Sequence, residues 1–323
     1  MKKQTIGYWE SLKLPYNKIS VPDSGIQNLL NASIRNIYQS IEFEKGIPVV
    51  KTGSSSNRQF NIADAAFIID ALTMLNEKND GRKVIEYLIS QQNSDGSFQQ
   101  TDKDWKATGY ALWTIANHAR LTGDKDWLES VWPSLEKGFT FLMELTNKTK
   151  QQTKSAYAGL IPPGYGSEGQ GIDYVHNYWA LTGLNSAITA ARWVGRNGQA
   201  IKWQSQYDDL YFVFLESMKK NMRKDVNGIQ YLPARATSDK KAQAQKHQWA
   251  FLNAVYPGKG IRPERSGFNR KHENAGEEYK RRIAVWNRVD AKWNCNSYCI
   301  GLRPCVAMDR KSTVGARHSL CLG

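Results

Sequence analysis

The pattern of apolar residues along the first 259 positions is that of amphipathic helices joined by short polar turns. After Pro22, either Asp23 or Ser24 can cap the first free N–H groups of a helix. Apolar residues then follow on one helical stripe, made of Ile26, Leu29, Leu30, Ile34, Ile37 and Ile41. By the same criterion we predict helices over about 26–41, 62–76, 82–92, 105–121, 126–145, 173–194, 199–221 and 244–255. Strand signals are few, and the best one runs from Gly228 to Leu232.

Two helix ends in this pattern are alike. The run 119–123, Ala-Arg-Leu-Thr-Gly, closes one predicted helix, and 72 residues later the run 191–195, Ala-Arg-Trp-Val-Gly, closes another. Helices 105–121 and 173–194 are apolar almost all round, whereas the helices that follow them have a polar face. A repeated helical hairpin with buried and two-faced helices in alternation indicates an inner and an outer layer. We therefore predict an all-α fold, an α/α toroid of helical hairpins.

The character of the sequence changes after Lys259. Residues 260–323 show no sustained apolar period and hold all four cysteines. They carry 13 Lys and Arg against 6 Asp and Glu, so a fifth of the chain supplies half of the net charge of +14. We divide the chain into an N-terminal lead-in (1–23), a partial helical domain (24–259) and an aberrant tail (260–323).

The basic tail raises the question of nucleic-acid or metal binding. Without the tail, 31 Lys and Arg stand against 24 Asp and Glu and are scattered along helix faces, which is no nucleic-acid footprint. The spacing of the cysteines fits no common zinc site, so we treat them as incidental thiols: Cys295, Cys299, Cys305 and Cys321. We expect no nucleic-acid partner, no metal and no cofactor.

No stretch of the sequence is apolar over the length needed to cross a bilayer, and we expect no membrane partner. The first five residues have the charge of a signal-peptide n-region, but Gly7 to Ser11 supply no apolar h-region. The chain as given is therefore expected to be cytoplasmic, unless its native start lies upstream of Met1.

Several ordered motifs within residues 7–259 resemble one family. They are Tyr8-Trp9-x2-Leu12-x-Leu14-Pro15, Ala63-Asp64-Ala65-x-Phe67, Asp95-Gly96-Ser97-Phe98, Trp105-Lys106-x-Thr108-Gly109 and Gly159-Leu160-Ile161-Pro162-Pro163-Gly164. Together they are similar to bacterial six-hairpin (α/α)6 glycoside hydrolases, near the α-L-rhamnosidase-like and glucoamylase-like catalytic domains. The resemblance implies a saccharide or glycoside substrate, bound in the mouth of a helical ring. Hydrolysis there needs two carboxyl groups, one to protonate the leaving oxygen and one to activate water or attack carbon.

The resemblance suggests roles for residues at two helix entrances. Arg58 and Asp64 are expected to bind the sugar at the first entrance. Asp64 stands where glucoamylase-like relatives hold sugar hydroxyls with an acidic residue; alternatively it only stabilises the first helical turn. Trp105 and Lys106 are expected to bind the sugar at the next entrance, where Trp105 is either a stacking platform or a core anchor. Asp104 is a catalytic candidate, or else the cap of that helix.

A third entrance follows residues 164–172, which are too rich in glycine for a packed element. Glu168 and Asp173 are catalytic candidates, because a flexible loop with acids at a helix mouth suits a general acid. Alternatively, Asp173 caps its helix and Glu168 is a solvated surface residue. We expect sugar contacts from further residues on the same helix, Tyr174, Asn177 and Trp179, and from the start of the last predicted helix, His247, Gln248 and Trp249.

A six-hairpin ring needs about twelve helices, and residues 260–323 do not supply the missing ones. Read one base out of frame, the codons of residues 282–291 permit the peptide Gly-Leu-Pro-Tyr-Gly-Thr-Gly-Trp-Met. This peptide resembles a segment that the family carries after a Tyr-Pro-Gly-Lys motif, which stands here at 256–259. We therefore expect an out-of-frame, disordered tail, an incomplete ring and a missing second carboxylate. A naturally divergent tail is the alternative, and an early stop codon in the displaced frame of the coding DNA would favour it.

The leading function is thus a glycoside hydrolase domain, inactive in this chain if the later hairpins are lost. An open ring can also serve as a non-catalytic carbohydrate-binding or scaffold protein. A terpenoid-cyclase-like toroid is suggested by Gln92-x2-Asp95-Gly96-Ser97-Phe98. That motif should recur around such a ring and be joined by an Asp-rich motif, but it occurs once.

Overall fold

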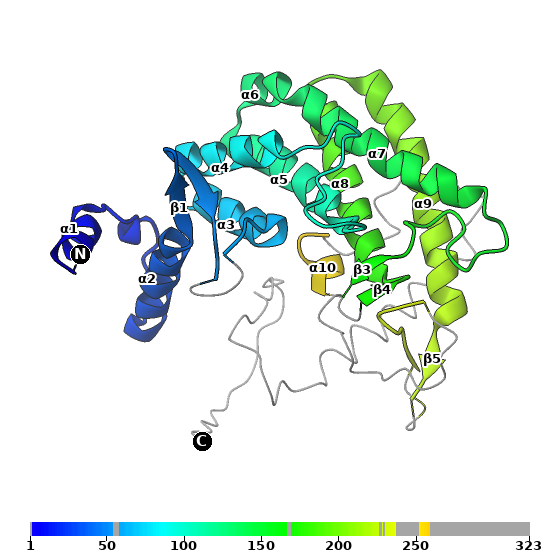
Figure 1. Ribbon diagram of the computed structural model, residues 1–323, viewed down its shortest axis with the longest axis horizontal. Coiled ribbons are helices and arrows are strands. Elements are labelled where there is room, and N and C mark those ends of the chain that lie inside the picture. Colours follow the sequence, from blue (N-terminus) through cyan, green and yellow to red (C-terminus); the bar gives the residue numbers. More distant parts are fainter. Residues whose placement is uncertain are drawn as a thin grey trace, which may run out of the picture. The chain divides into compact units, whose positions relative to one another are not determined.

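A computed structural model describes residues 2–53, 58–166, 169–225, 228, 230–236 and 252–258. This part of the chain is helical apart from three short β-hairpins, and the all-α prediction is confirmed (Figure 1). The helices are α1 (Lys2–Ser11), the 3₁₀ turn η1 (Tyr16–Lys18), α2 (Ser24–Gln39), α3 (Ile62–Met74), α4 (Lys78–Ser90), α5 (Lys106–Thr122), α6 (Lys125–Ser130), α7 (Trp132–Lys150), α8 (Tyr174–Trp193), α9 (Asn197–Asn221) and α10 (Leu252–Val255). The antiparallel strand pairs are β1 (Ile41–Glu44) with β2 (Ile47–Val50), β3 (Gly164–Gly166) with β4 (Gly169–Gly171), and β5 (Arg223–Lys224) with β6 (Gln230–Tyr231).

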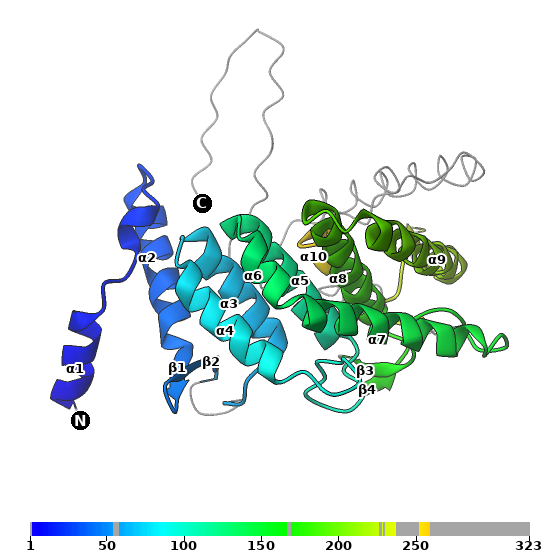
Figure 2. The ribbon, with the colours of Figure 1, turned by 90° about the horizontal axis from the view of Figure 1, so that it is seen from above.

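The helices from α3 onward form two layers. α5 packs between α3 and α8, and these three make up the inner layer. α4 lies against α3, α7 against α5 and α8, and α9 against α8, and these make up the outer layer (Figure 2). α5 and α8 are buried almost all round, whereas α4 and α9 keep exposed faces. This is the alternation that the repeated helix ends predicted.

Glycine sets the spacing within the inner layer. Gly109 in α5 faces the backbone of α8, and a Cβ there would overlap the carbonyl group of Trp179. Gly183 in α8 faces Gly109 in turn, so the two helices touch backbone to backbone. α5 ends at Gly123, whose φ of 73° is left-handed and which is the predicted helix stop. The close contact holds the N-terminal ends of α5 and α8 next to each other.

The predicted helix 126–145 is in fact two helices. α6 is capped by Asp124, whose Oδ1 accepts a hydrogen bond from the Trp127 N–H at 2.9 Å. The chain leaves the helix at Val131 and starts α7 with Pro133 in its first turn. Proline has no N–H to continue α6 but fits the start of a new helix. α7 then runs to Lys150, past the predicted end.

The first predicted helix is also shorter than expected, because Ile41 belongs to β1. Of the two candidate caps, Asp23 is the one used, and its Oδ1 accepts a hydrogen bond from the Ile26 N–H at 2.9 Å. Ile34 is buried, whereas Ile26 and Leu29 are 54% and 57% exposed. Part of the predicted apolar stripe therefore lies at the surface of the described chain.

Other predictions fall wholly or partly outside the described residues. Of the predicted helix 244–255, the structure describes 252–255, which form α10. The tail 260–323, with its cysteines and its proposed change of frame, lies outside them and stays a prediction. Of the predicted strand 228–232, the residues Gln230 and Tyr231 form β6. Among the described helices, none is long and apolar enough to cross a membrane.

Candidate active site

Asp64 lies in the first turn of α3 and does not cap it. The cap is Asn61, whose side chain accepts a hydrogen bond from the Asp64 N–H at 3.1 Å. The Asp64 carboxylate is partly exposed, and its Oδ2 accepts a hydrogen bond from Thr52 Oγ1 at 2.6 Å. This carboxylate is therefore held in place at the N-terminal end of the inner layer, with room for another partner.

Asp104 precedes α5 and forms an ion pair with Lys106, while no side chain caps this helix. The two side chains are 19% and 22% exposed. Lys106 Nζ also donates to the backbone carbonyl of Tyr165 in β3, at 3.2 Å. The ammonium group thus ties the carboxylate to the β3–β4 hairpin and fixes its direction.

Asp64 and Asp104 both act electrostatically on Tyr110, in the second turn of α5. Burial raises the pKa of the Tyr110 hydroxyl, and the negative charges of Asp104 and then Asp64 raise it further. Asp64 lies in the first turn of α3 and Asp104 just before α5, and these two helices pack against each other. The N-terminal ends of two packed inner helices therefore each carry a carboxylate.

Arg58 lies beside this end of α3. It pairs with Glu42 of β1, and its Nη1 donates to the carbonyl of Gly53 at 3.3 Å. It therefore joins the segment before α3 to the β1–β2 hairpin. Thr52 of the same segment is the residue that reaches Asp64.

Trp105 and Asn177 hold the segment that leads into the β3–β4 hairpin. The indole N–H of Trp105 donates to the Pro163 carbonyl at 3.1 Å, and its ring centroid lies 6.2 Å from that of Phe141. The side-chain oxygen of Asn177 accepts a hydrogen bond from the Ile161 N–H at 3.0 Å. Trp105 is partly buried and Asn177 fully buried. These contacts favour the core-anchor role for Trp105 and make Asn177 a support of the loop.

Tyr174 and Trp179 point into the core as well. Tyr174 is 1% exposed, and its hydroxyl lies 3.1 Å from Ser217 Oγ in α9. Trp179 is fully buried and stacks on Tyr110 with ring centroids 3.6 Å apart. Tyr174, Asn177 and Trp179 are thus all buried in the described structure, and their direct contact with a sugar stays a prediction.

Asp173 is buried at the N-cap position of α8, but its side chain makes no capping hydrogen bond. Its carboxylate accepts two hydrogen bonds from Arg235, from Nε at 2.6 Å and from Nη2 at 3.0 Å. Arg235 also donates to the Gly169 carbonyl at 3.1 Å, so the pair clamps the β3–β4 hairpin to the start of α8. No local signal in the sequence marks Arg235, which lies 62 residues from its partner.

Residues 164–172, predicted to be a loop, include the β3–β4 hairpin. Its glycines make room for the clamp, because a Cβ on Gly166 or Gly171 would overlap the Asp173 carboxylate or the Arg235 guanidinium. Glu168 lies outside the described residues, so its catalytic role stays a prediction. The same holds for the last three candidates, His247, Gln248 and Trp249.

An aromatic surface on the inner layer was not predicted. It consists of Phe67, Tyr110, Trp113, Trp179 and Tyr256, whose neighbouring ring centroids lie 3.6 to 6.5 Å apart. Phe67 is 39% and Tyr256 49% exposed, so these two rings are open to solvent. Helical spacing alone does not tell an exposed aromatic ring on an inner helix from a buried one.

A buried carboxylate, that of Asp70, contacts one of these aromatic side chains, Tyr256. Asp70 is 7% exposed and accepts hydrogen bonds from Asn117 Nδ2, at 2.7 Å, and from the Tyr256 hydroxyl. Burial raises the pKa of Asp70, and the two hydrogen bonds partly offset this. The carboxylate thus joins α3, α5 and the segment after α10.

The motif that suggested a terpenoid cyclase is a structural turn. Asp95 Oδ1 accepts a hydrogen bond from the Ser97 N–H at 2.9 Å. Gln92 Nε2 donates to the carbonyl of Gly96 and to that of Ser134, both at 2.9 Å. These bonds account for both polar side chains without any cyclase chemistry.

No known family model matches the chain. The chain is similar to an uncharacterized glycosyl hydrolase of Methanocaldococcus jannaschii, with 24% identity over 156 residues. The match covers 44% of this chain and 25% of the relative, so the chain spans about a quarter of the length of the curated relative that it matches. This similarity supports a glycosidase-like protein and no finer assignment.

Proposed function

We propose that residues 24–259 are part of a glycoside hydrolase whose sugar site lies at the N-terminal ends of α3, α5 and α8. The observation that carries the proposal is that Asp64 and Asp104 stand at the N-terminal ends of two inner helices that pack on each other, with Asp104 tied by Lys106 to the β3–β4 hairpin. The similarity to a protein named as a glycosyl hydrolase and the layers of helical hairpins agree with it. The partner is then a saccharide or glycoside.

The proposal divides the chemistry among the residues at this end. Asp64 binds sugar hydroxyls, and Asp104, held by Lys106, activates water or attacks the anomeric carbon. Glu168 is the proposed general acid, because it belongs to the segment that Lys106 contacts through Tyr165. The scissile bond then breaks as the leaving oxygen takes up the Glu168 proton.

Asp173 acts through Arg235 in this scheme. The ion pair between them fixes Gly169 of the β3–β4 hairpin to the start of α8. Asp173 is therefore a positioning residue and needs no contact with the sugar. Its substitution should lower kcat through the placement of the acid, with a smaller effect on KM.

A panel of nitrophenyl glycosides tests the proposal on the full chain. We expect release of nitrophenol from at least one of them, and a KM raised about tenfold or more by Asp64→Asn, since that change removes a charged hydrogen-bond acceptor. Asp126→Asn alters an exposed carboxylate in the first turn of α6 and should leave KM unchanged. No turnover of any glycoside in the panel would overturn the proposal.

A non-catalytic carbohydrate-binding protein is the second candidate. It is favoured by the exposed rings of Phe67 and Tyr256, which can pack on a sugar without any carboxyl pair. Calorimetric binding of a monosaccharide that is lost in Phe67→Ala, kept in Asp104→Asn and accompanied by no turnover would support this candidate over the hydrolase.

A further inference from the structure

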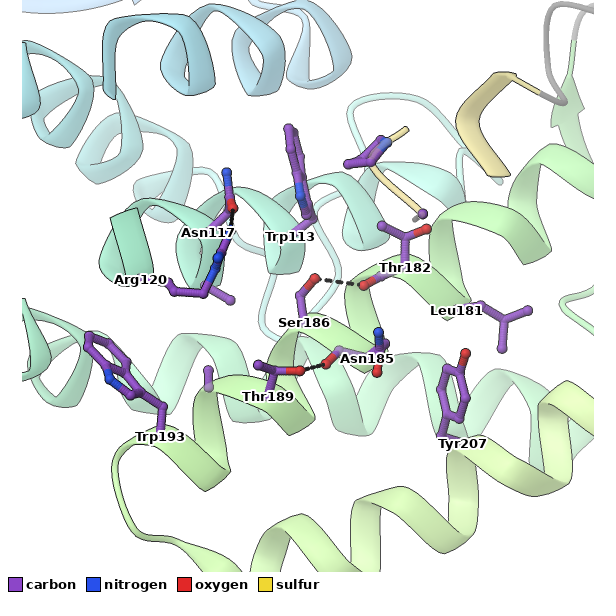
Figure 3. A pocket seen from close by; sticks show the side chains of 14 residues that line it. Trp113, Asn117, Arg120, Leu181, Thr182, Asn185, Ser186, Thr189, Trp193 and Tyr207 are labelled. Carbon is purple, nitrogen blue, oxygen red and sulfur yellow. Dashed lines mark hydrogen bonds between the residues drawn. The ribbon is translucent and has the colours of Figure 1, made fainter. Parts of the chain in front are cut away.

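A separate pocket lies toward the C-terminal ends of α5 and α8 (Figure 3). Its walls come from these two helices, from Tyr207 of α9 and from Pro257 and Gly258. Its cavity volume is about 90 Å³. A pocket of this size holds several water molecules, which a small polar ligand can displace.

One wall of the pocket carries a cation. Arg120 is exposed, and its Nη2 donates to Asn117 Oδ1 at 2.8 Å, as seen in Figure 3. A guanidinium has five N–H donors, so this bond orients the group and leaves others for a ligand. Among the described residues that line the pocket, Arg120 carries a positive charge and none is Asp or Glu.

The nearby carboxylate of Asp70 does not line the pocket. It interacts electrostatically with Arg120, but Asn117 and Tyr256 already hydrogen-bond its two oxygens. An anionic group in the pocket would therefore meet the Arg120 guanidinium without facing a carboxylate in the lining. This is the electrostatic setting for a carboxylate ligand.

The opposite wall offers hydroxyl and amide groups from α8. Asn185 is exposed, and no hydrogen bond within the described residues uses its side-chain amide. The hydroxyls of Ser186 and Thr189 donate to the carbonyls four residues earlier, at 2.8 Å, so each oxygen keeps its lone pairs as acceptors. These groups suit a ligand with several hydroxyls of its own.

Aromatic side chains complete the pocket. Trp113, Trp193 and Tyr207 lie around it in Figure 3, and the last two are partly exposed. Aromatic faces pack well on the apolar face of a sugar ring. We propose that this pocket binds a sugar acid, with its carboxylate on Arg120 and its ring among the aromatic side chains. The site is distinct from the proposed catalytic end and does not depend on hydrolysis.

Calorimetric titration of the full chain tests this proposal. The probes are D-glucuronate and D-galacturonate, with D-glucose and D-galactose as uncharged matches and acetate as the carboxylate alone. We expect saturable binding of a sugar acid, about tenfold or more tighter than its uncharged match and than acetate. No saturation, or equal binding of acetate, would overturn the proposal.

Variants assign the binding to this pocket. Arg120→Gln removes the charge at an exposed position and should weaken binding at least about tenfold, as should Asn185→Asp, which adds a repelling charge. Arg35→Gln, at an exposed arginine of α2, is the matched control and should not change it. Asp104→Asn should not change it either, so the failure of either proposal leaves the other testable. Unchanged binding in Arg120→Gln, with an unchanged circular dichroism spectrum, contradicts the assignment.

Discussion

Arg235 holds the Asp173 carboxylate with two parallel hydrogen bonds, of 2.6 Å and 3.0 Å, across 62 residues of sequence. The Asp173 side chain is 7% exposed and that of Arg235 22%. Arg235 also donates a hydrogen bond to the carbonyl of Gly169. Its contacts therefore connect α8, the β3–β4 hairpin and the segment after β6. The geometry of the proposed site therefore depends on a pair that touches no substrate.

Removal of Arg235 should be strongly destabilising. Arg235→Met leaves the Asp173 charge buried without its partner, and we expect the free energy of unfolding to fall by on the order of 3 kcal/mol. The double change with Asp173→Asn should restore part of this loss, because no buried charge remains. Urea denaturation measures both. Arg192→Met, at an exposed arginine of α8, is the control, and an equal effect there would rule out a special role for the clamp.

The contact between α5 and α8 allows a test of the inner layer. Gly109→Ala places a methyl group against the Trp179 carbonyl, and we expect a loss of roughly 2–3 kcal/mol in unfolding free energy. Gly198→Ala is the matched control, because nothing lies within 4 Å of a Cβ there. That change should be neutral or should stabilise by up to about 1 kcal/mol. Similar melting temperatures for the two variants would mean that α5 and α8 are not in close contact.

The stability of the protein should depend on pH through buried histidines. His118 is 1% exposed and lies 2.8 Å from the Thr73 hydroxyl, and burial, followed by the charge of Arg82, lowers its pKa to about 4. Burial also lowers the pKa of His176 to about 3. The unfolded chain takes up these protons near pH 6.5, well before the folded chain does. The folded state therefore loses stability as the pH falls below about 6.5.

Urea unfolding at pH 7 and pH 5 measures this loss. We expect on the order of 2 kcal/mol for each histidine over that range. His118→Gln should retain the contribution of His176 and lose its own, so its stability should change less with pH. An identical pH dependence in the variant and the unaltered protein would show that His118 is not buried as described.

Local signals predicted much of the fold. Asp23 and Gly123 mark a helix start and a helix end through their own chemistry, a side-chain acceptor and a left-handed glycine, and both act as expected. The alternation of buried and two-faced helices could be predicted because the width of the apolar stripe on a helix indicates how much of its surface is buried. The apolar periodicity continues across the break between α6 and α7, and Pro133 is the residue in the sequence that marks this break.

The site was harder to predict, because its contacts are not local. The partners in the Asp173–Arg235 clamp lie 62 residues apart, and Tyr256 reaches Asp70 across 186 residues. Tyr174 and Trp179 stand at a helix entrance, but the sequence does not show that α9 and α5 cover them. Asp64 and Asp104 could be named in advance because each begins an inner helix, where the N-terminal ends gather.

If the Asp104 carboxylate takes part in glycoside hydrolysis, as proposed, its loss must slow the reaction. The most direct measurement is kcat/KM of the full chain and of Asp104→Asn on the nitrophenyl glycoside that the chain hydrolyses best. We expect the substitution to lower kcat/KM by about 10²- to 10⁴-fold, as is usual for the loss of a group that transfers a proton in catalysis. Asp126→Asn should retain the full rate. Equal activity in Asp104→Asn and Asp126→Asn would contradict the account.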